Sequence, residues 1–98
     1  MKIKNKTLLI TGGTGSFGNA VLSRFLNTDH FKEIRIFSRD EKKQDDMRTR
    51  LKSTKLKFYI GDVRDYSSVE RAMRGVDYVF NAAALKQVPS CEFFPIEA

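Results

Sequence analysis

The hydrophobic positions of this chain form short apolar runs separated by stretches with a single apolar stripe. The runs are rich in β-branched and aromatic residues, and they predict strands at residues 7–11, 33–38, 57–60 and 76–82. The stretches between them predict three helices: one that follows Gly15, one over residues 40–51 and one over residues 67–75.

Apolar residues in the first and third of these stretches have the i, i+3, i+4, i+7 spacing of one helical face. They are Gly18, Val21, Leu22 and Phe25 in the first, and Val69, Ala72, Met73 and Val76 in the third. The middle helix is polar, and its thin apolar stripe consists of Met47 and Leu51. After the fourth strand, only a helical turn near residues 85–88 is expected.

Strands that alternate with helices predict right-handed βαβ units. The expected fold class is therefore α/β: a partial, Rossmann-type doubly wound parallel sheet, with four strands in the order 3-2-1-4 and helices on both faces. Ligands of such sheets bind outside the carboxyl ends of the strands, where the strand order reverses.

The turn after the first strand, TGGTGSFG, has three glycines with different expected uses. Gly12 can adopt the positive φ of a tight turn, Gly15 allows a pyrophosphate to approach the backbone, and Gly18 allows the helix to pack closely on the sheet. Free N–H groups of the helix and the hydroxyls of Thr14 and Ser16 are further donors. A plain glycine-rich turn is the alternative, but the flanking strand and helix favour a dinucleotide.

The end of the second strand favours NADP over NAD. An NAD site usually carries Asp or Glu there, whereas this chain has SRDEKK. Hydroxyl, guanidinium and ammonium groups suit a 2′-phosphate. The candidate ligands are Ser38, Arg39, Lys42 and Lys43, whereas Asp40 repels a phosphate unless it turns away or pairs with a base. Ser38 and Glu41 also have the spacing of a helix capping box, which is compatible with an anion site.

Two further strand ends supply candidate cofactor contacts. Asp62 and Val63 follow the third strand, where a carboxylate can accept a hydrogen bond from an adenine amino group. Helix capping is the alternative use of Asp62, although Asp65 and Ser67 are better placed for it. The fourth strand ends in small side chains that either let a cofactor pass or pack tightly: Ala82, Ala83 and Ala84.

Composition limits the other classes of function. The 98 residues have a net charge of +6, much of it between Lys42 and Lys57. This leaves nucleic-acid binding open, but interleaved acids favour a solvated helix face and no aromatic platform accompanies the bases. The apolar run at residues 8–10 is too short for a secretory signal or a membrane span. The single cysteine, Cys91, predicts a reduced thiol and a cytoplasmic protein, and the single histidine, His30, makes no metal site.

Several segments together resemble the extended short-chain dehydrogenase/reductase superfamily, beginning with Thr11-Gly12-x-x-Gly15-x-x-Gly18. Within it, TGGTGSFG, FSRDEKKQ, YIGDVRD and AAALKQVPSCEFFPIEA are similar to soluble UDP-N-acetylglucosamine 4,6-dehydratases. The similarity is to the C5-inverting enzymes of capsule, O-antigen and flagellin-sugar biosynthesis. It covers essentially the whole chain, and its last segment is the most specific.

This resemblance implies tightly bound NADP and a cycle of C4 oxidation, loss of water across C5 and C6, and hydride return to C6. It places Thr14 to Phe17 under the diphosphate, Ser38 to Lys43 around the 2′-phosphate, and Asp62 and Val63 beside the adenine. By the same resemblance, Ala82 and Lys86 line the cofactor cleft. Lys86 also faces the substrate, a UDP-N-acetylglucosamine-type sugar nucleotide, and the full-length enzyme is a homo-oligomer.

No catalytic residue is assigned, because the family's Thr-Asp-Lys segment and Tyr-x-x-x-Lys pair are not found in these 98 residues. Residues 1–98 are therefore interpreted as the N-terminal portion of an NADP-binding Rossmann domain, with partial NADP affinity and no turnover of its own. A non-catalytic NADP-binding module is an alternative, as is another extended short-chain enzyme of sugar nucleotides, an epimerase or reductase. The outer edge of the fourth strand is expected to be unpaired.

Overall fold

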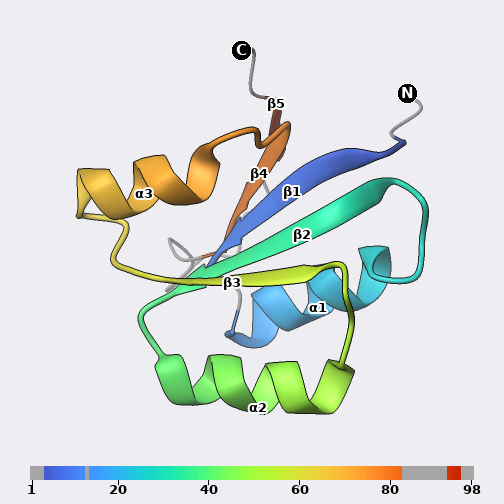
Figure 1. The fold of residues 1–98 in the computed structure, drawn as a ribbon, viewed down its shortest axis with the longest axis horizontal. Helices are drawn as coiled ribbons and strands as arrows, with labels where there is room; N and C mark the ends of the chain where they lie inside the picture. Colours follow the sequence, from blue (N-terminus) through green and yellow to red (C-terminus); the bar gives the residue numbers. More distant parts are fainter. Residues whose placement is uncertain (1–3, 13, 83–92, 96–98) are drawn as a thin grey trace.

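The computed structural model describes residues 4–12, 14–82 and 93–95. Strands and helices alternate along most of this chain (Figure 1). The elements are β1 (Lys6–Thr11), α1 (Ser16–Phe25), β2 (Phe31–Ser38), α2 (Glu41–Leu51), β3 (Leu56–Ile60), α3 (Tyr66–Met73), β4 (Tyr78–Asn81) and β5 (Phe93–Pro95).

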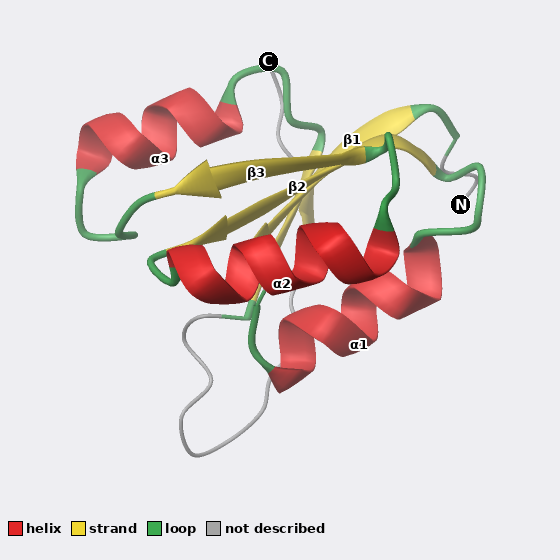
Figure 2. Ribbon diagram, turned by 60° about the horizontal axis from the view of Figure 1, so that its bottom comes forward, coloured by secondary structure: helices red, strands yellow, loops and turns green. Residues whose placement is uncertain are grey.

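The strands form one sheet in the order β3-β2-β1-β4-β5, and its first four members pair in parallel. The expected strand order 3-2-1-4 is therefore confirmed. Helices α1 and α2 cover one face of the sheet and α3 covers the other (Figures 1 and 2). In the middle of the sheet, Ile10 of β1 is in register with Ile36 of β2 and with Phe80 of β4. The carboxyl ends of these strands consequently meet at one edge.

The core consists of two layers, one on each face of the sheet. Leu8 and Ile10 of β1 belong to the layer under α1 and α2, whereas Leu9 belongs to the layer under α3. The first layer also holds Val21, Leu22, Phe31, Ile34, Ile36, Met47, Leu56 and Phe80, and the second holds Phe37, Ala72 and Val76. Burial on both faces explains why β1 is an unbroken apolar run rather than an alternating one.

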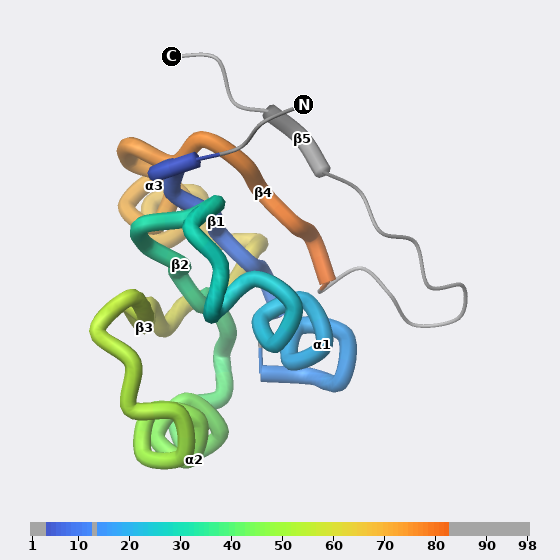
Figure 3. Tube along the Cα trace, turned by 90° about the vertical axis from the view of Figure 1, so that its right-hand side faces the viewer, coloured from blue at the N-terminus to red at the C-terminus, as the bar shows by residue number. Residues whose placement is uncertain are grey.

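The edge of β4 is paired, so the expectation of an unpaired edge is wrong. β5 runs antiparallel to β4, with Val79 in register with Phe94. Figure 3 shows β4 next to β1, on the side of the sheet opposite β3. The prolines near this segment obscured the strand in the sequence. Pro95 is nevertheless compatible with it, because a terminal strand of a sheet tolerates a residue without an N–H group. The predicted turn at residues 85–88 lies outside the described residues.

The start of α2 also differs from prediction. Ser38 is still part of β2, and the residue that caps α2 is Asp40, whose Oδ1 accepts a hydrogen bond from the Lys43 N–H at 2.9 Å. The capping box of Ser38 and Glu41 is therefore wrong. On the buried face of this helix, Gln44 accompanies Met47, whereas the apolar pattern had indicated only Met47 and Leu51.

A tight contact surrounds Gly61, which directly follows β3. A Cβ atom at this position would lie 2.7 Å from Ser68 Cβ and 2.9 Å from Phe37 Cζ. We expect Gly61→Ala to lower the free energy of unfolding by about 1–3 kcal/mol, because both neighbours are held in packed elements. Denaturant titration of the variant and the wild type measures the difference. An unchanged midpoint and slope would show that the turn after β3 yields without cost.

Candidate dinucleotide-binding site

A cavity of about 470 Å³ lies at the carboxyl ends of β1, β2 and β3. It brings together the glycine-rich turn, the end of β2 and the turn after β3. Its lining residues are Gly12, Thr14, Gly15, Phe37, Ser38, Arg39, Lys43, Gly61, Asp62, Val63 and Arg64. A second cavity of about 540 Å³ shares Thr14, Ser38 and Arg39 with it and is also lined by Asp40 and Glu41. Three of the four strand ends singled out in the sequence thus border the first cavity.

The glycine-rich turn is held by its own backbone. Gly12 has a φ of +68°, as predicted, and its N–H donates to the Phe37 carbonyl of β2 at 2.7 Å. Its carbonyl accepts a hydrogen bond from the Gly15 N–H at 3.2 Å. The turn is consequently tied both to the neighbouring strand and across itself.

Asn19 of α1 holds the other side of the turn. Its Nδ2 donates to the Gly15 carbonyl at 3.0 Å and to the Thr14 carbonyl at 3.3 Å. Its Oδ1 accepts a hydrogen bond from Arg50 Nη2 of α2 at 3.0 Å. The sequence pattern did not indicate this role, because an Asn in the polar face of a helix has no distinctive spacing.

The N-terminus of α1 carries no side-chain cap. Gly15 occupies the capping position, and the first turn contains no acidic residue. Asp40 and Asp65, by contrast, cap α2 and α3. In the described part of the chain, the first N–H groups of α1, at residues 16–18, have no helical acceptor, and such groups bind anions readily. Gly18, in the same turn, is buried as predicted.

Packing within the protein does not require a glycine at position 15. Its φ of −81° is accessible to any residue, and an added Cβ would lie 3.6 Å from the Gly12 carbonyl oxygen. That distance is an ordinary van der Waals contact. A side chain at this position would instead extend into the cavity, where it would keep a ligand away from the helix N-terminus. This is the geometry expected of a phosphate-binding glycine.

Basic and hydroxyl groups lie at the end of β2, as predicted. Ser38 is 8% exposed and lines both cavities, whereas the Arg39 side chain is 72% exposed and lies beside it. Lys43 lines the first cavity, and Lys42 is exposed and lines neither. Asp40 uses one carboxylate oxygen to cap α2, where it accepts a hydrogen bond from the Lys43 N–H, and it also lines the second cavity.

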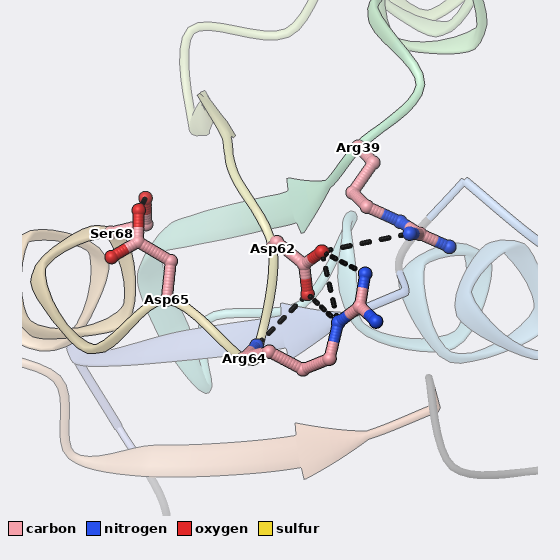
Figure 4. Close-up of polar contacts among 5 residues, drawn as sticks. All are labelled: Arg39, Asp62, Arg64, Asp65 and Ser68. Atoms are coloured by element: carbon pink, nitrogen blue, oxygen red, sulfur yellow. Dashed lines mark hydrogen bonds and ion pairs between the residues drawn. The ribbon is translucent and has the colours of Figure 1, made fainter.

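Asp62 accepts hydrogen bonds from two sources on Arg64 (Figure 4). The Arg64 guanidinium reaches Asp62 Oδ2 at 2.7 Å through Nη2, and the Arg64 N–H reaches Oδ1 at 2.9 Å. Arg39 Nη1 lies 3.6 Å from the same carboxylate. The side-chain and backbone hydrogen bonds of Arg64 hold the pKa of the Asp62 carboxyl well below its usual range.

Asp65, rather than Asp62, caps α3, as expected. Its Oδ1 accepts a hydrogen bond from the Ser67 N–H at 3.2 Å, and its Oδ2 accepts one from the Ser68 hydroxyl at 2.8 Å. The hydrogen bond from Ser68, followed by that from Ser67, lowers the pKa of the Asp65 carboxyl. Figure 4 shows Asp65 and Ser68 together, while the two arginines converge on Asp62. Asp62 is therefore not needed to cap α3, and it lines the first cavity.

The end of β4 is tied to β1. The Ala82 N–H donates to the Thr11 carbonyl at 2.9 Å, and the Thr11 hydroxyl donates to Asn81 Oδ1 at 2.7 Å. Ala82 packs against the core layer under α1 and is not among the residues that line the two cavities. The other candidates after this strand lie outside the described residues: Ala83, Ala84 and Lys86.

Similarity to known proteins identifies the family of this chain. A family model described as "Polysaccharide biosynthesis protein" matches residues 8–98. The chain belongs to this family. The match spans most of the chain, from β1 onward, and it agrees with the predicted resemblance at the level of an extended short-chain dehydrogenase/reductase type of nucleotide-sugar protein.

Relatives of this family member include two rickettsial proteins named UDP-glucose 4-epimerase. The one from Rickettsia akari (strain Hartford) is 75% identical over 97 residues, which are 96% of this chain and 28% of that protein. The one from Rickettsia bellii (strain RML369-C) is 74% identical over the same shares. The chain thus spans 28% of the length of these curated relatives. Their names agree with the epimerase alternative and not with the specific dehydratase.

A solved structure supports the fold of this family member. The X-ray structure of Pen from Bacillus thuringiensis matches it with a TM-score of 0.79 and 42% sequence identity. The match covers 89% of this chain and 28% of that chain. Within the described ranges, none of the helices has the length and hydropathy needed to cross a membrane. The same ranges contain no group of three or more His, Cys, Asp or Glu residues placed to hold a metal ion.

The contact between Asp62 and Arg64 predicts how the ionisation of the Asp62 carboxyl and the stability of the fold depend on pH. We expect the Asp62 carboxyl to stay ionised near pH 4, where an ordinary aspartate of pKa about 3.9 is half protonated. Because its folded pKa is depressed, the pair stabilises the fold above the unfolded pKa, and this contribution is lost as the pH falls toward the folded value. Carboxyl-detected NMR titration measures the pKa directly.

The matched variant for this titration is Arg64→Gln, which should return the Asp62 pKa toward the ordinary value. If Asp62 of the wild type titrates at the ordinary aspartate value, the contact with Arg64 does not persist in solution.

Proposed function

We propose that this chain binds NADP and forms the cofactor-binding part of an enzyme that modifies a nucleotide sugar. One observation carries the proposal: Gly15 leaves open space in front of an uncapped helix N-terminus, at the edge of a cavity that the strand ends border. The proposal assigns the dinucleotide diphosphate to the N–H groups of residues 16–18. Thr14 lies where its hydroxyl can add a donor.

The groups at the end of β2 favour NADP over NAD. A 2′-phosphate beside Ser38 would meet the Arg39 guanidinium and the Lys43 ammonium, and the Asp40 carboxylate is engaged in the helix cap. The ribose of NAD carries hydroxyls instead, which an acidic residue serves better. The adenine is assigned to the turn after β3, where Val63 is exposed and lines the cavity together with Asp62.

The reaction proposed for the whole protein is that of a UDP-N-acetylglucosamine 4,6-dehydratase. Its support is the similarity of several segments to such enzymes, including FSRDEKKQ and AAALKQVPSCEFFPIEA. The nicotinamide would supply hydride transfer, first from the sugar C4 and then to C6 after water is lost across C5 and C6. Lys86 is proposed to face the sugar nucleotide. The acid and base groups are proposed to lie in the part of the relatives that this chain does not match.

A UDP-glucose 4-epimerase is the second candidate, because the two rickettsial relatives carry that name. Both reactions begin with oxidation at C4, so the cofactor site described above serves either. They differ in their later steps, since epimerisation returns hydride to C4 and loses no water.

Calorimetry with the 98-residue chain tests cofactor binding. We expect NADP to bind at least about tenfold more tightly than NAD, since one charge-assisted contact of roughly 1.4 kcal/mol has that effect. Gly15→Ala should abolish most of this binding. The free energy of unfolding of the Gly15→Ala variant should change by less than about 1 kcal/mol. The cost of Ala at a capping position is offset by the lower entropy of the unfolded chain. Equal binding by a folded variant would contradict the phosphate-binding role of this turn.

The reaction is tested with a chimeric protein. It joins this chain to the part of a relative that the chain does not match. Incubation with UDP-N-acetylglucosamine should give a product lighter by the mass of one water, with a label from C4 recovered at C6. A product of unchanged mass and inverted C4 from UDP-glucose would favour the epimerase instead. Neither product, from a protein that binds NADP, would favour a non-catalytic module.

A further inference from the structure

Gln44 of α2 is a polar side chain almost completely removed from solvent, at 1% exposure. Its Nε2 donates to the Tyr59 carbonyl at 2.9 Å and to Ser38 Oγ at 3.0 Å. These bonds connect α2 to the ends of β2 and β3, at the edge where the cavity lies. A buried amide at this place is therefore in contact with a residue of the candidate site.

The direction of the Gln44 amide follows from its partners. The Tyr59 carbonyl can only accept a hydrogen bond, so the amide nitrogen must face it rather than the amide oxygen. The nitrogen has two protons, and the Tyr59 carbonyl accepts one of them. The other is directed at Ser38, whose Oγ accepts it at 3.0 Å, while the Ser38 carbonyl lies farther away at 3.5 Å. Gln44 Oε1 is buried with no hydrogen-bond partner in the described part of the chain. The fold tolerates that cost while keeping both bonds of the nitrogen.

The Ser38 hydroxyl proton is thereby directed away from Gln44. Its oxygen accepts from Gln44, so its own proton must point elsewhere, and Ser38 lines both cavities beside Arg39. Among the described residues, this hydroxyl has no acceptor of its own. We propose that Gln44 is a positioning residue that turns the Ser38 O–H toward the 2′-phosphate and so favours NADP. This inference rests on the NADP site proposed above.

The chemistry of the two cofactors explains why this arrangement discriminates between them. A phosphate oxygen only accepts hydrogen bonds, and a bond to its charge is stronger than one between neutral groups. The 2′-hydroxyl of NAD is neutral, so as an acceptor it gains less from the same Ser38 proton. Gln44 then acts on NADP affinity through Ser38 and leaves NAD affinity almost unchanged.

The test is a double-mutant cycle with Ser38→Ala and Gln44→Met, in which calorimetry measures the dissociation constants of NADP and NAD. We expect Ser38→Ala to reduce the preference for NADP by roughly tenfold, the effect of one lost charge-assisted hydrogen bond. Gln44→Met alone should reduce the preference for NADP to a similar extent. It should have no further effect on this preference when Ser38→Ala is already present. Thr49→Met, at an exposed position of the same helix, is the matched control.

Three results would overturn the inference. If Gln44→Met weakens NADP and NAD equally, or acts equally in both backgrounds, its role is only structural. If Ser38→Ala keeps the full NADP preference, the inference fails even where Gln44→Met does not fold. In each of these three cases, a wild-type preference for NADP leaves the proposed function standing. A folded wild type without that preference overturns the proposed NADP specificity together with this inference.

Discussion

The burial of β1 on both faces is the constraint on which the rest of the structure depends. Leu8 and Ile10 pack under α1 and α2, and Leu9 packs under α3. The backbone of a strand buried in this way needs hydrogen-bonded neighbours on both edges, and β2 and β4 supply them in parallel. Their register brings three carboxyl ends to one edge of the sheet, where each polar turn must find partners outside the core. The candidate site is the result of that arrangement.

Among the helices that the structure describes, only α1 begins without an acidic partner. Asp40 and Asp65 neutralise the N-termini of α2 and α3, whereas the N-terminus of α1 has no such partner. Asp62 holds the guanidinium of Arg64 and lies near that of Arg39 (Figure 4). These exposed ion pairs contribute little to stability. Their effect is to concentrate donors at the cavity while the unpartnered helix end remains open.

The sequence was sufficient for the parts of the fold that depend on periodicity. Alternating strands and helices predicted the order 3-2-1-4, and the spacing of the turn predicted the positive φ of Gly12. Three features were missed for separate reasons. The strand β5 is short and lies among prolines. The capping residue of α2 depended on where β2 ends, which a pattern locates only to within a residue or two. Gln44 acts through contacts between elements, which no local spacing records. The contact of Arg64 is with Asp62, only two residues away, but no helix or strand period marks such a pair in a turn.

The central claim is that the chain holds the diphosphate at the start of α1 and the 2′-phosphate at the end of β2. Amide NMR spectra recorded during titration with NADP, and in parallel with NAD, test it most directly. We expect the amide signals of residues 14–18 to shift with both cofactors. The signals of Ser38, Arg39 and Lys43 should shift more with NADP than with NAD. Shifts confined to the exposed bases of α2, abolished by moderate salt and equal for the two cofactors, would contradict it.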